Sequence, residues 1–481
     1  MTATTKWQTV IGLEVHAQLK TKTKIFCGCP TDFGHSENDQ VCQVCLGMPG
    51  VLPVLNKAAV EYAIKAGLAL NCEIAARTKF DRKNYFYPDL PKGYQISQYD
   101  EPICKGGHLV INGRKIRLHR AHLEEDAGKN VHVGAAGLHG SQYSKVDFNR
   151  SGVPLLEIVS EPDITSPEEA RDYLTELRSI LRYIDVCDGN LEEGSFRCDA
   201  NVSLKPEGAT ELGTKTEIKN MNSFKAVQRA IQSEIERQTG LLDRGERVIQ
   251  ETRLWHEADG VTHPMRSKEE AHDYRYFPEP DLVPLAVPRG WVEEMIRTMP
   301  ELPEARRTRY TQEHKLSADD VAVLVETKEM GDFFDKVLAL GTSAKDAANF
   351  LLNTVSAHLK EHKLDFNQLK LTPEHLRDLE RAVTAGTISR TAAKDVLVVL
   401  MEEGGSVSEV VDKKGLAQLS DEAGLREAVA QVLQASPTQL AEFHSGKTKV
   451  RQYFFGEVMK QTKGKANPAV VNKLLDELLK P

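Results

Sequence analysis

The chain begins with a stretch in which apolar and polar residues alternate. In residues 10–19 one set of alternate positions is apolar, namely Ile11, Leu13, Val15, Ala17 and Leu19. The other set holds Gly12, Glu14, His16 and Gln18. Successive side chains of a β-strand point to opposite faces, so the pattern predicts a strand with one face in a core. The other face would carry Glu14 and His16. A charged strand face often meets only solvent, and that alternative stays open.

Later segments repeat this arrangement. Residues 195–204 alternate cleanly, and one face of this predicted strand holds Arg197, Asp199, Asn201 and Ser203. Residues 215–223 predict a further polar-lined strand that includes Lys219. Arginine and lysine at such positions are natural phosphate binders.

Carboxylates also fall where a core is expected. Glu157 lies in the apolar run 155–159, and a buried carboxylate there needs a partner, either a structural salt bridge or a metal ion. A predicted strand ends in Glu124, Glu125 and Asp126. Two like charges about 4 Å apart repel by on the order of 4 kcal/mol at an effective dielectric of about 20. At an enclosed site a divalent cation compensates for this repulsion, and Mg²⁺ is usually held by few carboxylates together with nucleotide phosphates.

The hydrophobic period changes near Trp291. Before it, strand patterns alternate with helices predicted over 53–70, 167–183 and 224–238; after it, nearly every segment to Pro481 has helical period. Strands followed by a run of helices favour an α+β chain of several domains. We place the first domain at 1–295, a helical domain at 296–405 and a small all-α tail at 406–481.

Composition narrows the classes of function. The 481 residues carry a net charge of −8, whereas a non-specific DNA-coating protein is basic overall. Any nucleic-acid contact is therefore expected to be local. The sequence has no run of eighteen apolar residues and no apolar signal core at its start, so we expect no membrane span, no export and a cytoplasmic location.

Four of the eight cysteines are grouped. Cys27 and Cys29 form a C-x-C pair, and Cys42 and Cys45 form a C-x-x-C pair after twelve intervening residues. Four thiolates at this spacing suit a closed, structural Zn²⁺ site. Free buried thiols and a redox pair are the alternatives. The other four cysteines are scattered among apolar residues and are expected in the core.

Two stretches combine cations with aromatic residues. In 79–100 the cations are Lys79, Arg82, Lys83 and Lys92, and Tyr85, Tyr87, Tyr94 and Tyr99 offer stacking faces for bases. This stretch is too polar and aromatic to be only a hairpin, although an ordinary surface loop is the alternative. Residues 447–465 hold six basic residues against the single acid Glu457, with Tyr453, Phe454 and Phe455 interleaved. They favour an RNA-contacting appendage or a solvated helix face.

Several common active-site motifs are missing from the sequence. Gly446-Lys447-Thr448 resembles the end of a Walker A motif, but position 441 is Ala where the leading Gly is required. There is also no G-x-S-x-G elbow and no Gly/Ser-rich amidase stretch with a nucleophilic serine. A bound nucleotide would therefore have to lie on a polar-lined sheet.

Together the motifs resemble the B subunits of the aspartyl/glutamyl-tRNA(Asn/Gln) amidotransferases, the GatB family. The segments that carry the resemblance are 11–16, 80–89, 124–129, 154–163, 192–201 and 273–281. The resemblance covers essentially the whole chain. It implies a cradle domain built on an antiparallel sheet, then a helical domain and a YqeY-like, tRNA-binding tail.

The resemblance also implies an activity and partners. The family is an ATP-dependent carbon–nitrogen ligase with glutamine as the nitrogen donor. It phosphorylates the side-chain carboxylate of Glu-tRNA(Gln) or Asp-tRNA(Asn) with ATP and Mg²⁺, and ammonia then displaces the phosphate. The ammonia is channelled from a GatA-type glutaminase subunit, and a small GatC-type subunit completes the heterotrimer. Transfer RNA is a partner, with the mischarging aminoacyl-tRNA synthetase as a further one.

Residue roles follow from the resemblance. It places Mg²⁺ ligation on His16, Glu124 or Glu125, and Glu157, with Glu14 nearby. Because Mg²⁺ prefers oxygen ligands, the alternative role for His16 is to orient a bound water. The expected catalytic group is therefore Glu14, His16, Glu125, Glu157 and Asp199. Expected nucleotide contacts are Lys83, Arg197, Asn201 and Lys219. The competing hypothesis is a non-catalytic, zinc-containing RNA-binding scaffold.

Overall fold

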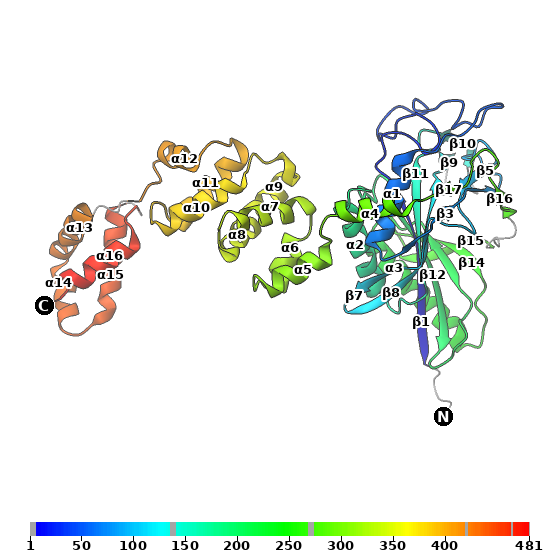
Figure 1. Ribbon diagram of the computed structural model, residues 1–481. Coiled ribbons are helices and arrows are strands. Elements are labelled where there is room, and N and C mark those ends of the chain that lie inside the picture. Colours follow the sequence, from blue (N-terminus) through cyan, green and yellow to red (C-terminus); the bar gives the residue numbers. More distant parts are fainter. Residues whose placement is uncertain (1–5, 135–140, 268–273, 419–421, 463–464, 481) are drawn as a thin grey trace. The chain divides into compact units, whose positions relative to one another are not determined.

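Figure 1 shows the computed structural model of the chain. It describes residues 6–134, 141–267, 274–418, 422–462 and 465–480. The chain divides into two compact units, Met1–Leu302 and Pro303–Pro481, and each is described by itself. The glycine-rich segment 134–140, which the sequence predicts to be a loop, lies outside the described residues from position 135 onward.

The first unit is built on one large sheet with the strand order β15-β14-β13-β12-β1-β11-β8-β6-β2, and β7 pairs with β8. Its strands are β1 (Trp7–Gln18), β2 (Glu73–Ile74), β6 (Cys104–Lys105), β7 (His108–Ile111), β8 (Arg114–Glu125), β11 (Pro154–Ser160), β12 (Phe196–Pro206), β13 (Thr216–Lys219), β14 (Glu251–His256) and β15 (Val261–Ser267). Neighbouring strands are antiparallel except β13 and β14, which are parallel. The predicted antiparallel sheet is thus confirmed.

The strand predicted at 10–19 lies inside this sheet, between β11 and β12. The side chains of Ile11, Leu13, Val15 and Ala17 are all 0% exposed. They belong to the core formed with helices α1 (Lys57–Ala69), α2 (Pro167–Tyr183) and α3 (Phe224–Asp243), which lie along one face of the sheet in Figure 1. The alternating pattern therefore assigned both faces of β1 correctly.

Helix α1 begins four residues later than predicted. Val54 and Asn56 donate their backbone N–H groups to Phe26 and Ile25, which holds this segment extended. The Asn56 side chain then accepts from the Ala58 N–H and caps the helix. Pro53 therefore precedes the helix rather than starting it.

Short sheets and one helix complete the first unit. They are β9 (Lys129–Gly134) with β10 (Ser141–Asp147), β3 (Arg77–Thr78) with β17 (Leu285–Ala286), the three strands β4 (Asp81–Asn84), β5 (Tyr94–Ser97) and β16 (Phe277–Pro278), and helix α4 (Arg289–Thr298). Strands β4 and β5 are antiparallel neighbours. Part of the aromatic stretch 79–100 thus forms a hairpin, and β16 adds a third strand beside it.

Every regular element described in the second unit is helical. The helices are α5 (Pro303–Gln312), α6 (Ala318–Leu324), α7 (Lys328–Ala339), α8 (Ala344–Phe350), α9 (Ser356–His362), α10 (Pro373–Thr384), α11 (Arg390–Glu402), α12 (Val407–Lys414), α13 (Glu422–Ala435), α14 (Pro437–His444), α15 (Arg451–Gln461) and α16 (Pro468–Leu478). A π-helical turn, Leu351–Val355, joins α8 to α9, and 3₁₀ turns occupy Phe366–Gln368 and Thr448–Val450. None of the described helices is long and apolar enough to cross a membrane.

The last helices share a core of their own. Buried residues of α13, α15 and α16, among them Leu425, Phe454 and Leu474, pack together. Helix α12, which our division assigns to the tail, packs against α10 and α11. The division of this half at residue 405 remains a prediction.

Candidate functional site

A row of ionisable side chains crosses the polar face of the large sheet. The register pairs His16 of β1 with Arg197 of β12 on one side and with Glu157 of β11 on the other. Glu157 in turn pairs with His122 of β8. Directly opposite residues have Cβ atoms about 4.5–5.5 Å apart. Strand pairing alone therefore brings these four side chains together, although they are far apart in the sequence.

A second row lies beside the first. Glu14 is the register partner of Asp199, and the Asn201 amide donates to the Glu14 carboxylate at 2.8 Å. The Lys219 ammonium pairs with Asp199 and lies 3.6 Å from Glu217. Burial would lower the pKa of Lys219, but these two carboxylates raise it above its ordinary value. Lys219 is thus a fixed cation next to two acids.

Glu157 is the centre of the first row. Its Oε2 atom lies 3.6 Å from His16 Nε2 and 3.5 Å from His122 Nε2. Burial would raise the pKa of Glu157, but His122, His16 and the Lys83 ammonium hold it well below its ordinary value. The pKa of His16 is also shifted. Burial alone would lower it, but the contact with Glu157 and the charge of Glu124 raise it above its ordinary value.

Glu124 completes a group of possible metal ligands. One ligand atom each of His16, Glu124 and Glu157 lies within 4.8 Å of the others. The Ser97 hydroxyl donates to Glu124 at 3.1 Å, and His122 Nε2 lies 3.7 Å away. The carboxylate–imidazole distances around Glu124 and Glu157 exceed the usual hydrogen-bond range of about 2.7–3.2 Å. The carboxylate oxygens and imidazole nitrogens therefore lie close together without forming hydrogen bonds to one another.

Lys83 of β4 faces this group. Burial would lower the pKa of its ammonium, but Glu124, the Tyr276 phenol and Glu157 raise it above its ordinary value. The Lys83 Nζ atom also lies 4.9 Å from the centroid of the Tyr274 ring. The short β4–β5–β16 sheet thus supplies a cation to the polar face of the large one.

Asp126 holds Arg197 in place. Arg197 donates to both Asp126 oxygens at 2.9 Å, and the Gln18 amide donates to the same carboxylate at 2.8 Å. Burial would raise the pKa of Asp126, but Arg197 and Arg150 lower it below its ordinary value. Arg197 is thereby fixed beside His16, with about a third of its side chain exposed.

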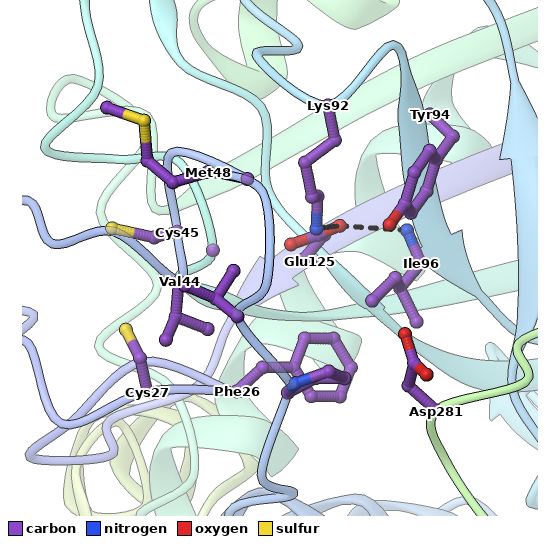
Figure 2. Close-up of a pocket in the computed structure, with 14 residues that line it drawn as sticks. Phe26, Cys27, Val44, Cys45, Met48, Lys92, Tyr94, Ile96, Glu125 and Asp281 are labelled. Carbon is purple, nitrogen blue, oxygen red and sulfur yellow. Dashed lines mark hydrogen bonds and ion pairs between the residues drawn. The ribbon is translucent and has the colours of Figure 1, made fainter.

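Glu125 does not join the group formed by Glu124. Its carboxylate accepts from the Ile96 N–H at 2.9 Å and pairs with Lys92 (Figure 2). Both contacts line a cavity of about 80 Å³ that also borders Cys27 and Cys45. Of the two adjacent glutamates that the sequence left as alternatives, the structure brings Glu124 to His16 and Glu157.

The four cysteines predicted as a group do converge. All eight cysteines are free thiols, and Cys27, Cys29, Cys42 and Cys45 place their sulfur atoms within 4.8 Å of one another. The sulfurs of Cys42 and Cys45 are 4.0 Å apart. The Cys27 thiol and the Lys24 ammonium lower the pKa of Cys45 to about 4, while burial opposes them. This cluster could hold a metal ion. The remaining cysteines are buried, as expected.

Three of the cations in residues 79–100 pair with carboxylates. Lys79 binds Asp81, Arg82 binds Glu279 at 2.7 Å, and Lys92 binds Glu125. Among the tyrosines, the Tyr99 ring stacks on Tyr276 with centroids 4.2 Å apart, whereas Tyr87 is exposed. Three of the four predicted phosphate binders in this segment are therefore held by carboxylates, and the fourth, Lys83, faces the group on the large sheet.

The basic stretch 447–465 only partly matches the exposed RNA-contacting surface that its sequence pattern favours. Phe454 is 0% exposed and belongs to the core of the last helices, whereas Tyr453 is 43% exposed. Arg451 binds Asp476 at 2.7 Å, and Lys460 lies 3.6 Å from Glu457. Lys463 lies outside the described residues. Phe454 is thus a core residue, and of the predicted alternation of basic and aromatic side chains only part lies on the surface.

Sequence reasoning gave no role to His122, and it named Asp126 only as one of three adjacent carboxylates, without its contact to Arg197. The signal was available for His122, because a period of two puts it on the same face of β8 as Glu124. The same rule separates Glu124 from Glu125. Asp126 follows the strand, so periodicity gave no signal for its contact with Arg197.

Two family models and several known proteins match the sequence of this chain. Residues 9–293 match the family model described as the GatB/GatE catalytic domain, and residues 332–479 match the GatB domain. A protein of Thermodesulfovibrio yellowstonii is 54% identical over 99% of this chain and 100% of its own length. Similar proteins of Brevibacillus brevis (53% identical) and Geobacter sulfurreducens (54%) are matched over 98% of this chain and 99% of their own lengths.

All three relatives are named as the B subunit of an aspartyl/glutamyl-tRNA(Asn/Gln) amidotransferase. The matches extend over both compact units. The residues gathered on the polar face, from His16 to Lys219, all lie within the match to the catalytic domain. The chain belongs to the GatB family.

Proposed function

We propose that this chain is the B subunit of a tRNA-dependent amidotransferase. It uses ATP to activate the side-chain carboxylate of Glu-tRNA(Gln) or Asp-tRNA(Asn), and it then hands the activated group to ammonia. The products are Gln-tRNA(Gln) or Asn-tRNA(Asn). The chain acts with a glutaminase A subunit and a small C subunit, since its relatives are named as one subunit of such an enzyme.

The chemistry explains why such a site needs charge of both signs. A carboxylate resists attack because its leaving group would be oxide, and phosphorylation replaces that leaving group with phosphate. Phosphoryl transfer depends mainly on positioning and on neutralising charge. The activated group must also be protected from water. The protein therefore has to gather anion-binding and cation-binding groups on a single face.

One observation carries the proposal. His16, Glu124 and Glu157 come from three strands and meet within 4.8 Å, while Lys83, Arg197 and Lys219 supply cations to the same face. A scaffold that only bound RNA would have no need to enclose facing carboxylates, because each costs desolvation free energy.

The donor set fits a magnesium ion. Glu124 and Glu157 offer the hard oxygen ligands that Mg²⁺ prefers, and His16 would orient a metal-bound water. Bound there, the ion would neutralise charge on the nucleotide phosphates. Arg197 and Lys219 would hold phosphate oxygens, Lys83 would face the carboxylate being activated, and Asn201 would position Glu14. Asp199 would keep Lys219 in place, and Glu125 belongs to the neighbouring cavity.

The cysteine cluster fits a structural zinc ion. A tetrahedral Cys₄ site with Zn–S bonds of about 2.3 Å puts its sulfurs about 3.8 Å apart, and Cys42 and Cys45 are 4.0 Å apart. A lowered pKa at Cys45 supplies the thiolate that a metal ligand needs. The ion would fix the loop around Cys27 and Cys45 next to the sheet.

The test is Glu157→Ala in the assembled complex, given mischarged tRNA, ATP and glutamine. We expect ATP-dependent amidation to be lost while tRNA binding and glutamine hydrolysis remain. Unchanged amidation would favour the RNA-binding scaffold instead. Supplying Glu-tRNA(Gln) and Asp-tRNA(Asn) separately identifies the substrate.

A further inference from the structure

The second compact unit contains another group of metal-ligand side chains. His358 and His362 lie on α9, and Glu402 is the last residue of α11. One nitrogen of each imidazole and one carboxylate oxygen lie within 4.8 Å of one another. The proposed amidotransferase chemistry uses none of these residues.

Local structure places both histidines on one side of α9. Residues four apart lie on the same face of an α-helix, and the two ring centroids are 4.4 Å apart. The helix follows the π-helical turn Leu351–Val355, and such turns often accompany functional sites. It ends at Lys363, whose backbone is left-handed with φ of 53°. The pair therefore sits in a short, well-delimited helix that meets α11 at Glu402.

His358 is the unusual member of the group. It is 7% exposed, whereas His362 and Glu402 are exposed. Within the part of the chain that the structure describes, His358 has a ring contact with His362 but no hydrogen bond or ion pair. A largely buried imidazole without a hydrogen-bond partner keeps its ring nitrogens available to a ligand, and neither nitrogen of His358 is completely shielded from solvent.

A comparable group in the first unit lacks this feature. His256 ends β14, Asp259 lies in the turn that follows and His263 lies on β15; all three residues are exposed. The Asp259 carboxylate already pairs with both imidazoles, at 3.0 Å and 2.9 Å. These three residues satisfy one another, whereas the group on α9 and α11 does not.

The donor set indicates which ion would bind. Two imidazoles and one carboxylate suit Zn²⁺, which accepts nitrogen and oxygen ligands in a tetrahedral arrangement with an open fourth position. Mg²⁺ and Ca²⁺ prefer oxygen ligands throughout. The H-x-x-x-H spacing also occurs in zinc proteases, but there a glutamate follows the first histidine as the general base. Here Leu359 occupies that position, so the site has no such base.

We propose that His358, His362 and Glu402 form a zinc-binding site that ties the end of α9 to the end of α11. Among the described residues, no hydrogen bond or ion pair otherwise joins these two helix ends. Because the bound ion needs both helices in their folded positions, its binding free energy stabilises the second unit.

The test compares variants of the full chain after removal of metal by a chelator and equilibrium dialysis against Zn²⁺. We expect His362→Ala to bind one Zn²⁺ per chain fewer than the unmodified protein. Glu361→Gln, which changes an exposed carboxylate between the histidines, should bind as much as the unmodified protein. Glu402→Gln is the second variant, since an amide is a poorer ligand; we expect its zinc affinity to fall at least tenfold.

Two further measurements keep this site apart from the cysteine cluster. With Co²⁺ in place of Zn²⁺, loss of His362 should lower the visible absorption by the contribution of the histidine site and leave the near-ultraviolet thiolate bands unchanged. Zinc should also raise the melting temperature of the second unit in the unmodified protein and in Glu361→Gln, but not in His362→Ala. Equal zinc binding and equal Co²⁺ spectra in the unmodified protein and His362→Ala would overturn the proposal.

Discussion

The polar face of the large sheet and the basic helix α15 both concentrate charge, but in different ways. On the sheet, partners such as Glu14 and Asn201 are 187 residues apart in sequence, and Glu157 is only 13% exposed at its side chain. On α15, Lys460 pairs with Glu457 three residues away, and its side chain is 78% exposed. Exposed pairs contribute about 0–1 kcal/mol, whereas breaking a buried pair costs about 3–5 kcal/mol. The two regions should therefore respond very differently to the same kind of substitution.

The largest effect is expected at Glu124. The substitution Glu124→Gln keeps the shape of the side chain but removes the negative charge that it contributes beside His16 and Glu157. Removing one group that stabilises charge in a transition state typically lowers the rate about 10²- to 10³-fold, and we expect such a fall in amidation by the assembled complex. Glu236→Gln, on the exposed side of α3, is the control. Equal activity of both variants would place the chemistry elsewhere.

The next effect is on stability, at Asp126. Asp126→Asn leaves the Arg197 guanidinium without its carboxylate, and we expect a loss of about 3 kcal/mol in the free energy of unfolding of the first unit. Asp172→Asn removes the partner of Arg171 from a pair in which neither side chain is buried and should cost less than about 1 kcal/mol. Urea unfolding followed by tryptophan fluorescence measures both. Similar losses would show that burial does not distinguish the two pairs.

A smaller, local effect is expected at the cysteine cluster. Cys42→Ser should release one metal ion per chain, because a closed Cys₄ site needs all four thiolates. Elemental analysis of the purified protein measures this. Cys72→Ala, at a cysteine outside the cluster, should keep the ion. A chain that holds no zinc before substitution contradicts the assignment.

The smallest effect is expected on α15. Lys460→Ala should leave the stability within about 0.5 kcal/mol and weaken tRNA binding only a few-fold. If the side chain contacts a phosphate, the slope of log affinity against log salt concentration should decrease by about 1. Filter binding at several salt concentrations measures this. An unchanged slope would identify α15 as a solvated surface.

The sequence predicted much of this architecture. The period of two in residues 10–19 identified the buried face of β1, and the change of period near Trp291 located the helical half. The prediction failed at Pro53, because backbone hydrogen bonds to Ile25 and Phe26 hold the following residues extended and the helix begins later. It also failed at Phe454, whose position beside basic residues suggested an interface although the side chain packs in a core. Both failures arise from contacts between segments that a local pattern does not contain.

By itself, then, the sequence determined which residues share a strand face, because alternation follows from the geometry of a single strand. It also determined the family, because several long motifs occur in one chain. Only the tertiary structure decided which faces meet. The choice of Glu124 over Glu125, the inclusion of His122 and the pairing of Asp126 with Arg197 depend on the register between strands. Register is set by how the whole core packs, which no single segment specifies.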